Sequence, residues 1–385
     1  GWYRTEFDVP QFQAGKRATI LFDGAMSHAN VYINGQKVGY WPYGYNSFHF
    51  DITKYLKPGE KNTLAVRLEN LPESSRWYPG AGLYRNVHLI ITEDAYIPVW
   101  GTYITTPSVN EKFAKVNVRT KVVLPEGADP AKYSVETSVW NPNKQKLTAV
   151  RTSLAQMKYN NNQAEQEFVI QAPSLWSPEM PALYSAETRL YEGDKLKDIY
   201  TTPFGIRSIE IIPDKGFFLN GKRTVFKGVC NHHDLGPLGA AVNDAAIRRQ
   251  IRILKDMGCN AIRTSHNMPA PELIRACDEM GMMIMAESFD EWNVAKCKNG
   301  YNLLFDEWAE KDLVNLLHNF RNNPSVVMWC IGNEVPNQWN EGDCKIAKWL
   351  QDICHREDPT RPVTQGMDAP DAVVNNNFAA VMDVA

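Results

Sequence analysis

The sequence has no cysteine before Cys230, and none of its seven cysteines forms a C-x-x-C pair. A disulfide-stapled scaffold is therefore not expected, and neither is a zinc site or a dithiol redox pair of that spacing. We interpret the cysteines as small buried side chains of one domain. Cysteine usage leaves the compartment open, so the periplasm and the cytoplasm of a bacterium both remain candidates.

Long apolar runs and an excess of one charge are missing too. The longest apolar run, 326–331, is strand-sized and far below the ~18 residues that a membrane span requires, so we expect no membrane span. The 41 basic and 44 acidic residues nearly cancel, which argues against a nucleic-acid partner. No G-x-S-x-G elbow of a serine hydrolase occurs. Gly80-Ala81-Gly82 lacks the third glycine and the following helix of a dinucleotide-binding motif.

Two β-rich segments occupy the first half of the chain. Residues 1–95 contain short alternating strands separated by turn signals such as Asn34-Gly35, a pattern that favours a jelly-roll β-sandwich with a sugar-binding role. Residues 96–207 repeat the alternation and fit an immunoglobulin-like β-sandwich that lacks the cysteine pair of antibody domains. The strands are expected at 18–22, 29–33, 47–50, 63–68, 87–91, 116–123, 134–140, 165–170 and 184–190.

Residues 208–385 differ because strands now alternate with helices, as in parallel β/α units. A hairpin is predicted over 217–229 through Asn220-Gly221, and the next helix is expected to begin at Asn243-Asp244 and to stop at Gly258. Further strands are predicted at 261–263, 282–285, 326–331 and 362–365, with 381–384 as a candidate sixth, and helices at 272–280, 307–320 and 345–356.

This third segment is too short for a whole barrel. A (β/α)8 TIM barrel needs eight strands and usually ~250 residues, so we expect an incomplete TIM-barrel catalytic domain and a chain that ends inside it. The predicted fold class is thus multidomain β plus α/β. Unpaired strands at the barrel edges invite contacts, so we expect them to be covered by further chain or by self-association in a homo-oligomer.

Polar residues follow the apolar part of four consecutive barrel strands. These stretches are Asn231-His232-His233-Asp234, 263–267, 287–292 and Gly332-Asn333-Glu334. The carboxyl ends of barrel strands form the catalytic face in this fold. Four such ends in a row predict an active site there.

Glu334 is the candidate catalytic residue, because a carboxyl group that leaves an apolar strand enters a cleft and suits general acid catalysis. Asn333 beside it has an amide that donates to and accepts from a substrate hydroxyl. Arg263 is suited to hold a carboxylate with two hydrogen bonds. His232 and His266 suit hydroxyl recognition, with a structural hydrogen bond as the alternative for each.

These residues carry a resemblance to a known family. The stretch 260–266 with downstream Cys277-Asp278, and the stretch 321–334 that ends in Asn333-Glu334, resemble the two signatures of glycoside hydrolase family 2. Residues 22–35 and 76–85 resemble its first domain. The family contains β-galactosidases, β-glucuronidases and β-mannosidases, and its domain order of jelly-roll, immunoglobulin-like sandwich and barrel is the order predicted above.

The resemblance implies a retaining β-glycosidase with a carbohydrate substrate. Glu334 matches the family's acid/base glutamate, and Asn333 matches its partner for the sugar 2-hydroxyl. A second carboxylate ~5 Å away attacks the anomeric carbon in such enzymes. In the family this nucleophile lies on strand seven, and Glu287, Asp290 and Glu291 match no family nucleophile. We therefore expect the nucleophile to be missing from these residues and the chain alone to be inactive.

The resemblance bears on metals and on substrate choice as well. Some relatives bind magnesium through a glutamate and a histidine after strand three, but the corresponding residues here are Glu291 and Asn293, so no metal and no other cofactor is predicted. The stretches 76–82 and 230–236 look most like bacterial β-galactosidases, in which the first domain sends a loop over the barrel mouth. A β-glucuronidase, another glycosidase of the family, or a non-catalytic carbohydrate-binding fragment are the alternatives.

Three further residues complete the predicted substrate site. Arg76 is assigned a substrate-facing role, with an interdomain ion pair as its alternative. Asp290 and Trp292 follow the third barrel strand and are placed among the substrate-binding residues, Trp292 as a wall against which a sugar could stack.

Overall fold

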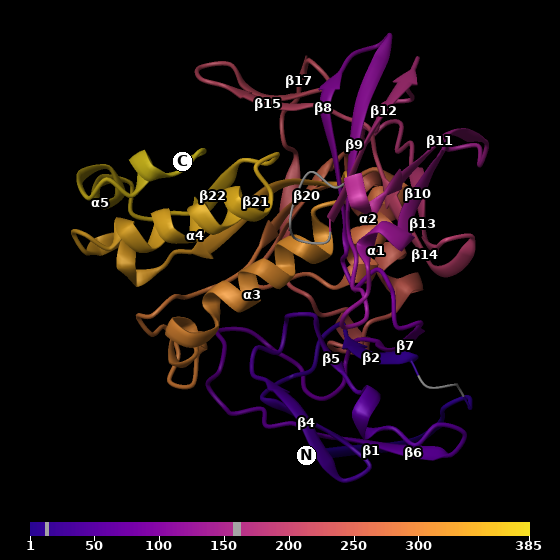
Figure 1. Ribbon diagram of the computed structural model, residues 1–385. Coiled ribbons are helices and arrows are strands. Elements are labelled where there is room, and N and C mark those ends of the chain that lie inside the picture. Colours follow the sequence, from indigo (N-terminus) through magenta and orange to yellow (C-terminus); the bar gives the residue numbers. More distant parts are fainter. Residues whose placement is uncertain (12–14, 157–162) are drawn as a thin grey trace.

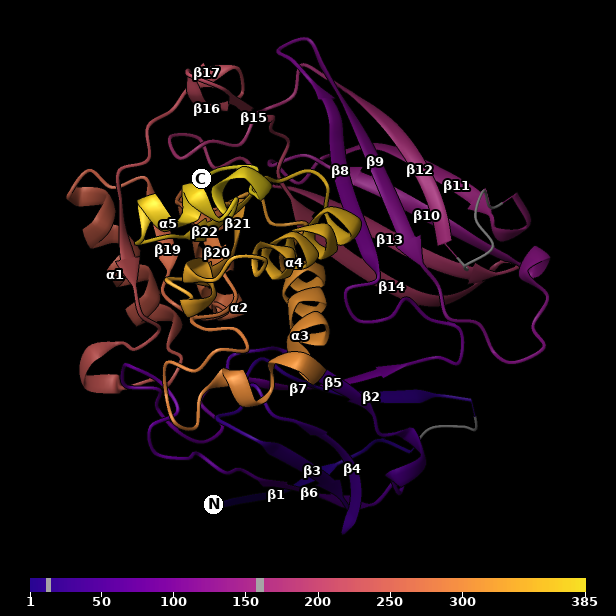
Figure 2. The same ribbon diagram turned by 90° about the vertical axis from the view of Figure 1, so that its left-hand side faces the viewer.

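The computed structural model describes residues 1–11, 15–156 and 163–385, which form two β-sandwiches and one parallel sheet flanked by helices (Figure 1). The sandwiches lie on two sides of the parallel sheet and its helices (Figure 2). This arrangement confirms the predicted fold class. In the described part of the chain, no helix has both the length and the apolar character of a membrane span.

The first sandwich forms because its strands alternate buried and exposed side chains, as in β2, and the buried faces meet in one core around Phe22 and Phe48. Its hairpin turns at Asn34-Gly35, where both residues have positive φ angles of 52° and 80°. One sheet has the order β1 (Trp2–Asp8), β6 (Lys61–Arg67), β3 (Ala29–Ile33), β4 (Gln36–Trp41), and the other β5 (Phe48–Asp51), β2 (Arg17–Phe22), β7 (Val87–Thr92).

The second sandwich is built in the same way, from antiparallel strands whose inner faces enclose cores around Phe168 and Tyr133. Thr102 and Thr202 from its two sheets meet at 2.6 Å between their hydroxyls. One sheet has the order β12 (Gln163–Gln171), β9 (Phe113–Lys121), β8 (Thr102–Val109), and the other β11 (Lys146–Ser153), β10 (Tyr133–Trp140), β13 (Tyr184–Glu192), β14 (Lys195–Phe204).

The parallel sheet is the barrel segment, and its five strands follow one another in sequence order. Helix α1 begins where the side chain of Asn243 accepts the Ala246 N–H, and Gly258 follows it with a φ of +87°. The strands are β18 (Gly228–Asn231), β19 (Ala261–Thr264), β20 (Met283–Glu287), β21 (Val326–Asn333) and β22 (Val363–Gly366), and the helices α1 (Asp244–Asp256), α2 (Pro271–Met280), α3 (Phe305–Phe320), α4 (Cys344–Glu357) and α5 (Pro370–Asn375).

Two predictions about local structure are wrong. The predicted hairpin through Asn220-Gly221 is present but ends at Arg223 instead of residue 229. Its strands β16 (Gly216–Leu219) and β17 (Lys222–Arg223) form a small separate sheet with β15 (Ile209–Ile212), and β18 starts a new one. The second strand breaks because β18 pairs with β19 instead of β16. The cysteines are not uniformly buried either, since Cys230 is exposed and only Cys277, Cys330 and Cys354 are buried.

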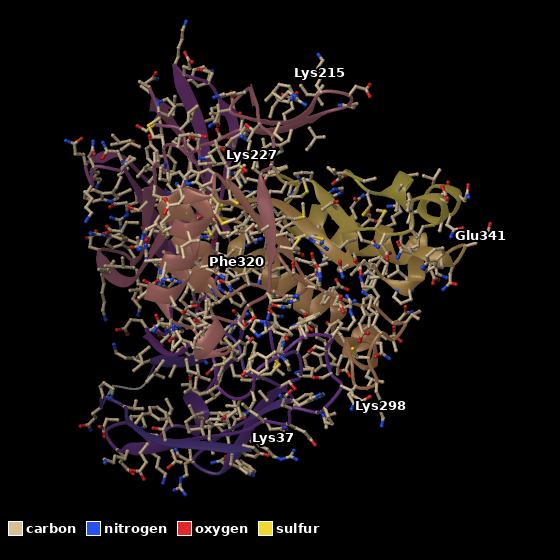
Figure 3. The ribbon with its side chains drawn as sticks, turned by 180° about the vertical axis from the view of Figure 1, so that it is seen from behind. Lys37, Lys215, Lys227, Lys298, Phe320 and Glu341 are labelled. Carbon is tan, nitrogen blue, oxygen red and sulfur yellow. The ribbon has the colours of Figure 1, made fainter. Side chains whose placement is uncertain are left out.

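The two edges of the barrel sheet differ from its centre. Every residue of β21 is buried, whereas β18 alternates between exposed and half-buried positions, and Val225 and Phe226 before it are 55% and 37% exposed. Figure 3, which shows the molecule from behind, labels Lys227, the residue that precedes β18. At the other edge, Val384 forms an isolated parallel bridge with Thr364 of β22, so the candidate sixth strand is reduced to one bridge. The expectation that further chain or self-association covers the β18 edge stays a prediction.

The first sandwich is fixed against the barrel segment by buried hydrogen bonds. Asp312 of α3 accepts the indole N–H of Trp41 at 2.8 Å and the amide of Asn46 at 2.7 Å. Arg85 donates to the backbone carbonyl of Met268 at 2.8 Å. Trp41 and Asn46 lie at the connection between β4 and β5, and Arg85 lies near the end of the segment between β6 and β7, so both parts of the first sandwich are held against the barrel segment.

Candidate active site

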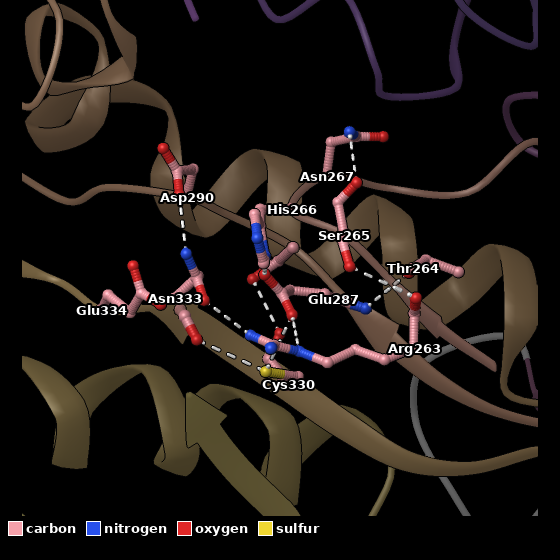
Figure 4. Close-up of polar contacts among 12 residues, drawn as sticks. Arg263, Thr264, Ser265, His266, Asn267, Glu287, Asp290, Cys330, Asn333 and Glu334 are labelled. Atoms are coloured by element: carbon pink, nitrogen blue, oxygen red, sulfur yellow. Dashed lines mark hydrogen bonds and ion pairs between the residues drawn. The ribbon is translucent and has the colours of Figure 1, made fainter. Parts of the chain in front are cut away.

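The carboxyl ends of β19, β20 and β21 bring the predicted polar residues together around Glu287 (Figure 4). Glu287 ends β20 with its side chain fully buried, accepts a hydrogen bond from Arg263 Nε and lies 2.7 Å from His266 Nδ1. Burial would lower the pKa of Arg263, but the carboxylate of Glu287 outweighs burial and raises it. This buried carboxylate therefore orients Arg263 and His266 and keeps few acceptor positions for a substrate.

The Asn333 side-chain amide accepts a hydrogen bond from one neighbour and donates one to another. Its Oδ1 accepts from Arg263 Nη2 at 2.9 Å, and its Nδ2 donates to Asp290 Oδ1 at 2.9 Å. The side chain is 1% exposed, so the amide has one orientation before any substrate arrives. That orientation follows from the pairing of donor with acceptor on each side.

Asp290 connects the barrel to the first sandwich. Arg76 donates to its carboxylate from Nε at 2.9 Å and from Nη2 at 2.6 Å, a two-pronged ion pair. Burial alone would raise the pKa of Asp290, but the hydrogen bonds from Arg76 and Asn333 and the charge of Lys296 outweigh it and lower the pKa. Asp290 is thus held as a carboxylate. Arg76 forms the interdomain ion pair and also lies at the site.

Glu334 follows the last residue of β21 and points away from the buried cluster. Its φ angle is +44°, a strained conformation for a residue with a side chain, and its N–H donates to the Gly366 carbonyl at 2.7 Å. The side chain is 41% exposed, and its Oε2 lies 3.8 Å from Arg76 Nη2. The fully buried strand thus ends in one accessible carboxylate beside a guanidinium.

Lys296 belongs to the same cluster, although no sequence pattern indicated it. Its Nζ donates to the backbone carbonyl of Asn333 at 2.6 Å and to Asp290 Oδ1 at 3.1 Å, and its side chain is 10% exposed. Burial lowers the pKa of Lys296, while the charge of Asp290 acts in the opposite direction. Lys296 therefore holds the peptide that precedes Glu334.

Aromatic rings border the site on the side of β18 and β19. Trp77, from the same segment as Arg76, has its ring 5.0 Å from His232 and 5.9 Å from His266 between centroids, and the two imidazoles lie 5.6 Å apart. Burial, followed by the charge of His266, lowers the pKa of His232, which favours its neutral form. Trp77 was not among the predicted site residues. Its position next to Arg76 in the sequence could have indicated that it lies at the site.

Trp292 lies elsewhere than expected. Its side chain is 0% exposed, its indole N–H donates to the Ile331 carbonyl at 2.9 Å, and its ring packs near Phe305 and Phe378. A wall residue must present a face to the substrate, and Trp292 presents none. Its large apolar ring fills the core behind β21 instead.

The carboxylate of Glu291 is used by its own loop. It accepts backbone N–H groups from Lys296, Cys297 and Asn302, and the Asn293 amide oxygen accepts from Asn337 at 2.9 Å. Among residues 1–11, 15–156 and 163–385, no group of three or more His, Cys, Asp or Glu side chains could hold a metal ion. The expectation of no metal remains a prediction.

Comparisons with known proteins place the chain in a family. Three family models of glycosyl hydrolases family 2 match it in succession: the sugar binding domain over residues 1–93, the central domain over 96–207 and the TIM barrel domain over 210–383.

Individual relatives cover the whole chain or nearly so. It is 41% identical to a β-galactosidase of Bacteroides ovatus over 100% of the chain and 49% of that protein, and 37% identical to a putative β-glucuronidase of Formosa agariphila over 96% and 34%. A crystal structure of a glycosyl hydrolase family 2 member from Bacteroides cellulosilyticus superposes with a TM-score of 0.93 and 36% identity, covering 100% of this chain and 49% of that one. The chain thus spans 49% of the length of the β-galactosidase relative and 34% of the length of the putative β-glucuronidase. The chain belongs to glycosyl hydrolases family 2.

Proposed function

We propose that this chain supplies the acid/base half of a retaining β-glycosidase, with Glu334 as the general acid and base. The observation that carries this proposal is the end of β21, where a fully buried strand terminates in the fixed amide of Asn333 and the accessible carboxyl of Glu334. The other carboxylates of the cluster are saturated by donors, whereas Glu334 has a single cation at 3.8 Å.

The proposed reaction has two displacements. Protonated Glu334 gives its proton to the glycosidic oxygen while a carboxylate nucleophile bonds to the anomeric carbon, and the aglycone leaves as an alcohol. Ionised Glu334 then takes a proton from water, whose oxygen attacks the anomeric carbon and releases the nucleophile. Asn333 would hold the sugar 2-hydroxyl through both steps, and Arg263 and Asp290 hold Asn333 in place.

The nucleophile is proposed to lie outside these 385 residues. Glu287 is fully buried and already engaged by Arg263 and His266, and Asp290 is engaged by Arg76, Asn333 and Lys296. A carboxylate whose lone pairs are occupied by cations and amides is a weak nucleophile. Neither residue fits the second role.

A β-galactoside is the proposed substrate, with a β-glucuronide as the alternative. The 41% identical relative is a β-galactosidase, and the 37% identical relative is described as a putative β-glucuronidase. The stretch Arg76 to Gly82, which supplies Trp77 to the site wall, is the part of the chain that looks most like bacterial β-galactosidases. For the gene product that carries this chain, kcat/KM should therefore be higher for an aryl β-galactoside than for the matching aryl β-glucuronide. A kcat/KM well in favour of the glucuronide would assign the site to glucuronides.

The experiment compares the purified chain with the gene product that carries it, using p-nitrophenyl β-galactoside. We expect no turnover by the chain alone and turnover by the gene product that Glu334→Gln removes. Glu341→Gln, on an exposed turn between β21 and α4 at the periphery of the molecule (Figure 3), is the matched control and should be fully active.

Turnover by the chain alone, lost in Glu334→Gln, would disprove the external nucleophile and keep the acid/base role. Sugar binding without turnover by chain and gene product alike would favour the carbohydrate-binding alternative.

A further inference from the structure

A cavity of about 450 Å³ lies between the second sandwich and the helices α3 and α4, away from the strand-end site. Its volume falls in the ~300–1,000 Å³ range of ligand pockets. His318 and Arg321 line it from the carboxyl end of α3, and that end precedes β21, so it lies at the opposite end of the strand from Glu334. The side-by-side packing of these helices with β8 and β9 is visible in Figure 2.

The lining of this cavity is strongly basic. It contains one carboxylate, Glu357, and four side chains that are positively charged at neutral pH: Arg119, Lys121, Arg321 and Arg356. Part of this charge is balanced from nearby, because Glu165 lies 3.6 Å from Arg119 and Glu310 lies 2.9 Å from Arg356. Within the described residues, Lys121 and Arg321 have no carboxylate at ion-pair distance.

Arg321 has two contacts within the fold, but one of its hydrogen-bond donors has no acceptor in the described part of the chain. Its guanidinium lies 4.5 Å from the ring centre of Tyr103, and Nη1 donates to the Glu357 carbonyl at 3.3 Å. Its Nε is buried and has no hydrogen-bond partner among the described residues. Burial lowers the pKa of Arg321, and the nearby charges of Glu357 and Asp358, which act in the opposite direction, do not outweigh it. The burial of this cation is therefore only partly compensated, and an anion in the cavity would compensate it further.

An aromatic side chain completes the cavity wall. Trp100 lines it with a φ angle of +56°, a conformation that residues with side chains adopt rarely, and the His49 ring meets the indole edge-to-face at 5.3 Å. Tyr103 is covered by Arg321, so the partly exposed indole of Trp100 is the ring available to a ligand. Aromatic faces of this kind pack well against the C–H face of a sugar.

We propose that this cavity is a second, non-catalytic saccharide site that binds an acidic sugar, with the sugar ring against Trp100 and its carboxylate on Arg321 and Lys121. A guanidinium fork and an ammonium group suit a carboxylate. A second cavity of about 390 Å³ shares Tyr103, Arg119 and Arg321 with the first, so the basic lining continues beyond one sugar unit. The ligand class is therefore a short oligosaccharide that contains uronic acid.

The test measures binding of trigalacturonate to the purified chain by titration calorimetry at low salt, with neutral galactotriose and inorganic sulfate as comparison ligands. We expect trigalacturonate to bind at least 10-fold more tightly than either. Arg321→Met and the exposed-site variant Lys121→Met should each weaken its binding about 10-fold. Arg249→Met, which removes an exposed cation of α1, should not, and neither should Glu334→Gln.

Several results would overturn the proposal. Equal affinity for galactotriose would remove the role of charge, and sulfate binding as tight as trigalacturonate would reduce the site to an anion pocket. Unchanged affinity in Lys121→Met and Arg321→Met, with both variants folded by circular dichroism, would place the ligand elsewhere. None of these readouts needs catalysis, so the result is independent of the function proposed for Glu334.

Discussion

The strand-end site and the cavity beside Tyr103 hold their basic side chains in different ways. At the strand ends, Arg76, Arg263 and Lys296 each donate to a carboxylate that is at least nine-tenths buried. Around the cavity, Lys121 and Arg321 lack such a partner in the described ranges. Paired charges fix the geometry of a reacting group. Unpaired charges at a cavity leave a charge for a ligand to balance.

The largest expected difference between the two regions is in catalysis. Glu334→Gln should lower kcat/KM of the gene product for phenyl β-galactoside, whose leaving group requires a proton, by about 10²- to 10⁴-fold, the usual contribution of a general acid–base residue. Arg321→Met should leave kcat/KM within about 2-fold, because the cavity lies at the other end of the barrel strands. Similar losses in both variants would show that the two regions are not separate.

Stability should separate the regions next. Arg263→Met leaves the fully buried Glu287 without its guanidinium, and removing one partner of a buried pair costs about 3 kcal/mol or more. Arg321→Met leaves no carboxylate behind and loses mainly a contact with Tyr103, worth about 1 kcal/mol. Urea unfolding of the purified chain measures both. An equal loss would contradict the contrast between paired and unpaired cations.

A smaller effect tests the part played by Lys296. Lys296→Met removes the donor to the Asn333 carbonyl, so the peptide before Glu334 should shift and kcat should fall about 10-fold, with little change in KM. Lys298→Met, an exposed neighbour in the same loop, should behave as wild type. A change in KM alone would indicate that Lys296 contacts the substrate rather than positioning Glu334.

A further contrast concerns carboxylates with and without a cation. Asp290 is paired and its pKa is lowered, whereas Asp312 accepts from Trp41, Asn46 and Tyr301, all neutral, and burial raises its pKa to about 6. In the unfolded chain its pKa is about 4, so the folded state binds more protons between these values. Its contribution to stability is therefore fully present below about pH 4 and falls as the pH rises to about 6, by at most about 1.4 kcal/mol per pH unit.

Urea unfolding of the chain between pH 4 and 7 measures this dependence. The difference in unfolding free energy between wild type and Asp312→Asn should change between about pH 4 and about pH 6 and should level off above about pH 6. Asp371→Asn, at an exposed position, should follow wild type throughout. A constant difference for Asp312→Asn would show that Asp312 has the same pKa in the folded and unfolded chain.

The sequence predicted the fold class and the strand-end position of Asn333 and Glu334, because both follow from local patterns. A fully apolar stretch before Asn333 indicates a buried parallel strand, and its polar end must emerge at the catalytic face. The hairpin over 217–229 was predicted too long because the residues of its second strand divide between two sheets, and pairing with β19 is a long-range contact.

Other parts of the site could not be predicted from local pattern. Trp292 was placed on the wall because an aromatic residue after a strand suits a sugar platform and a core equally well, and packing against Phe378 decides between them. Lys296 lies in a loop without periodicity, and its contact with the Asn333 carbonyl joins distant parts of the chain. The basic cavity combines residues of the second sandwich with Arg321 and Arg356, which are far apart in sequence.

The acid role of Glu334 is tested most directly by the first turnover of the Glu334→Gln gene product on two aryl β-galactosides. A dinitrophenyl group leaves without a proton, whereas a phenyl group with a poorer leaving oxygen requires one. The account predicts a rapid burst of dinitrophenolate near the wild-type rate and a phenol release slowed by at least about 10²-fold. Equal slowing of both leaving groups would contradict a proton donated by Glu334.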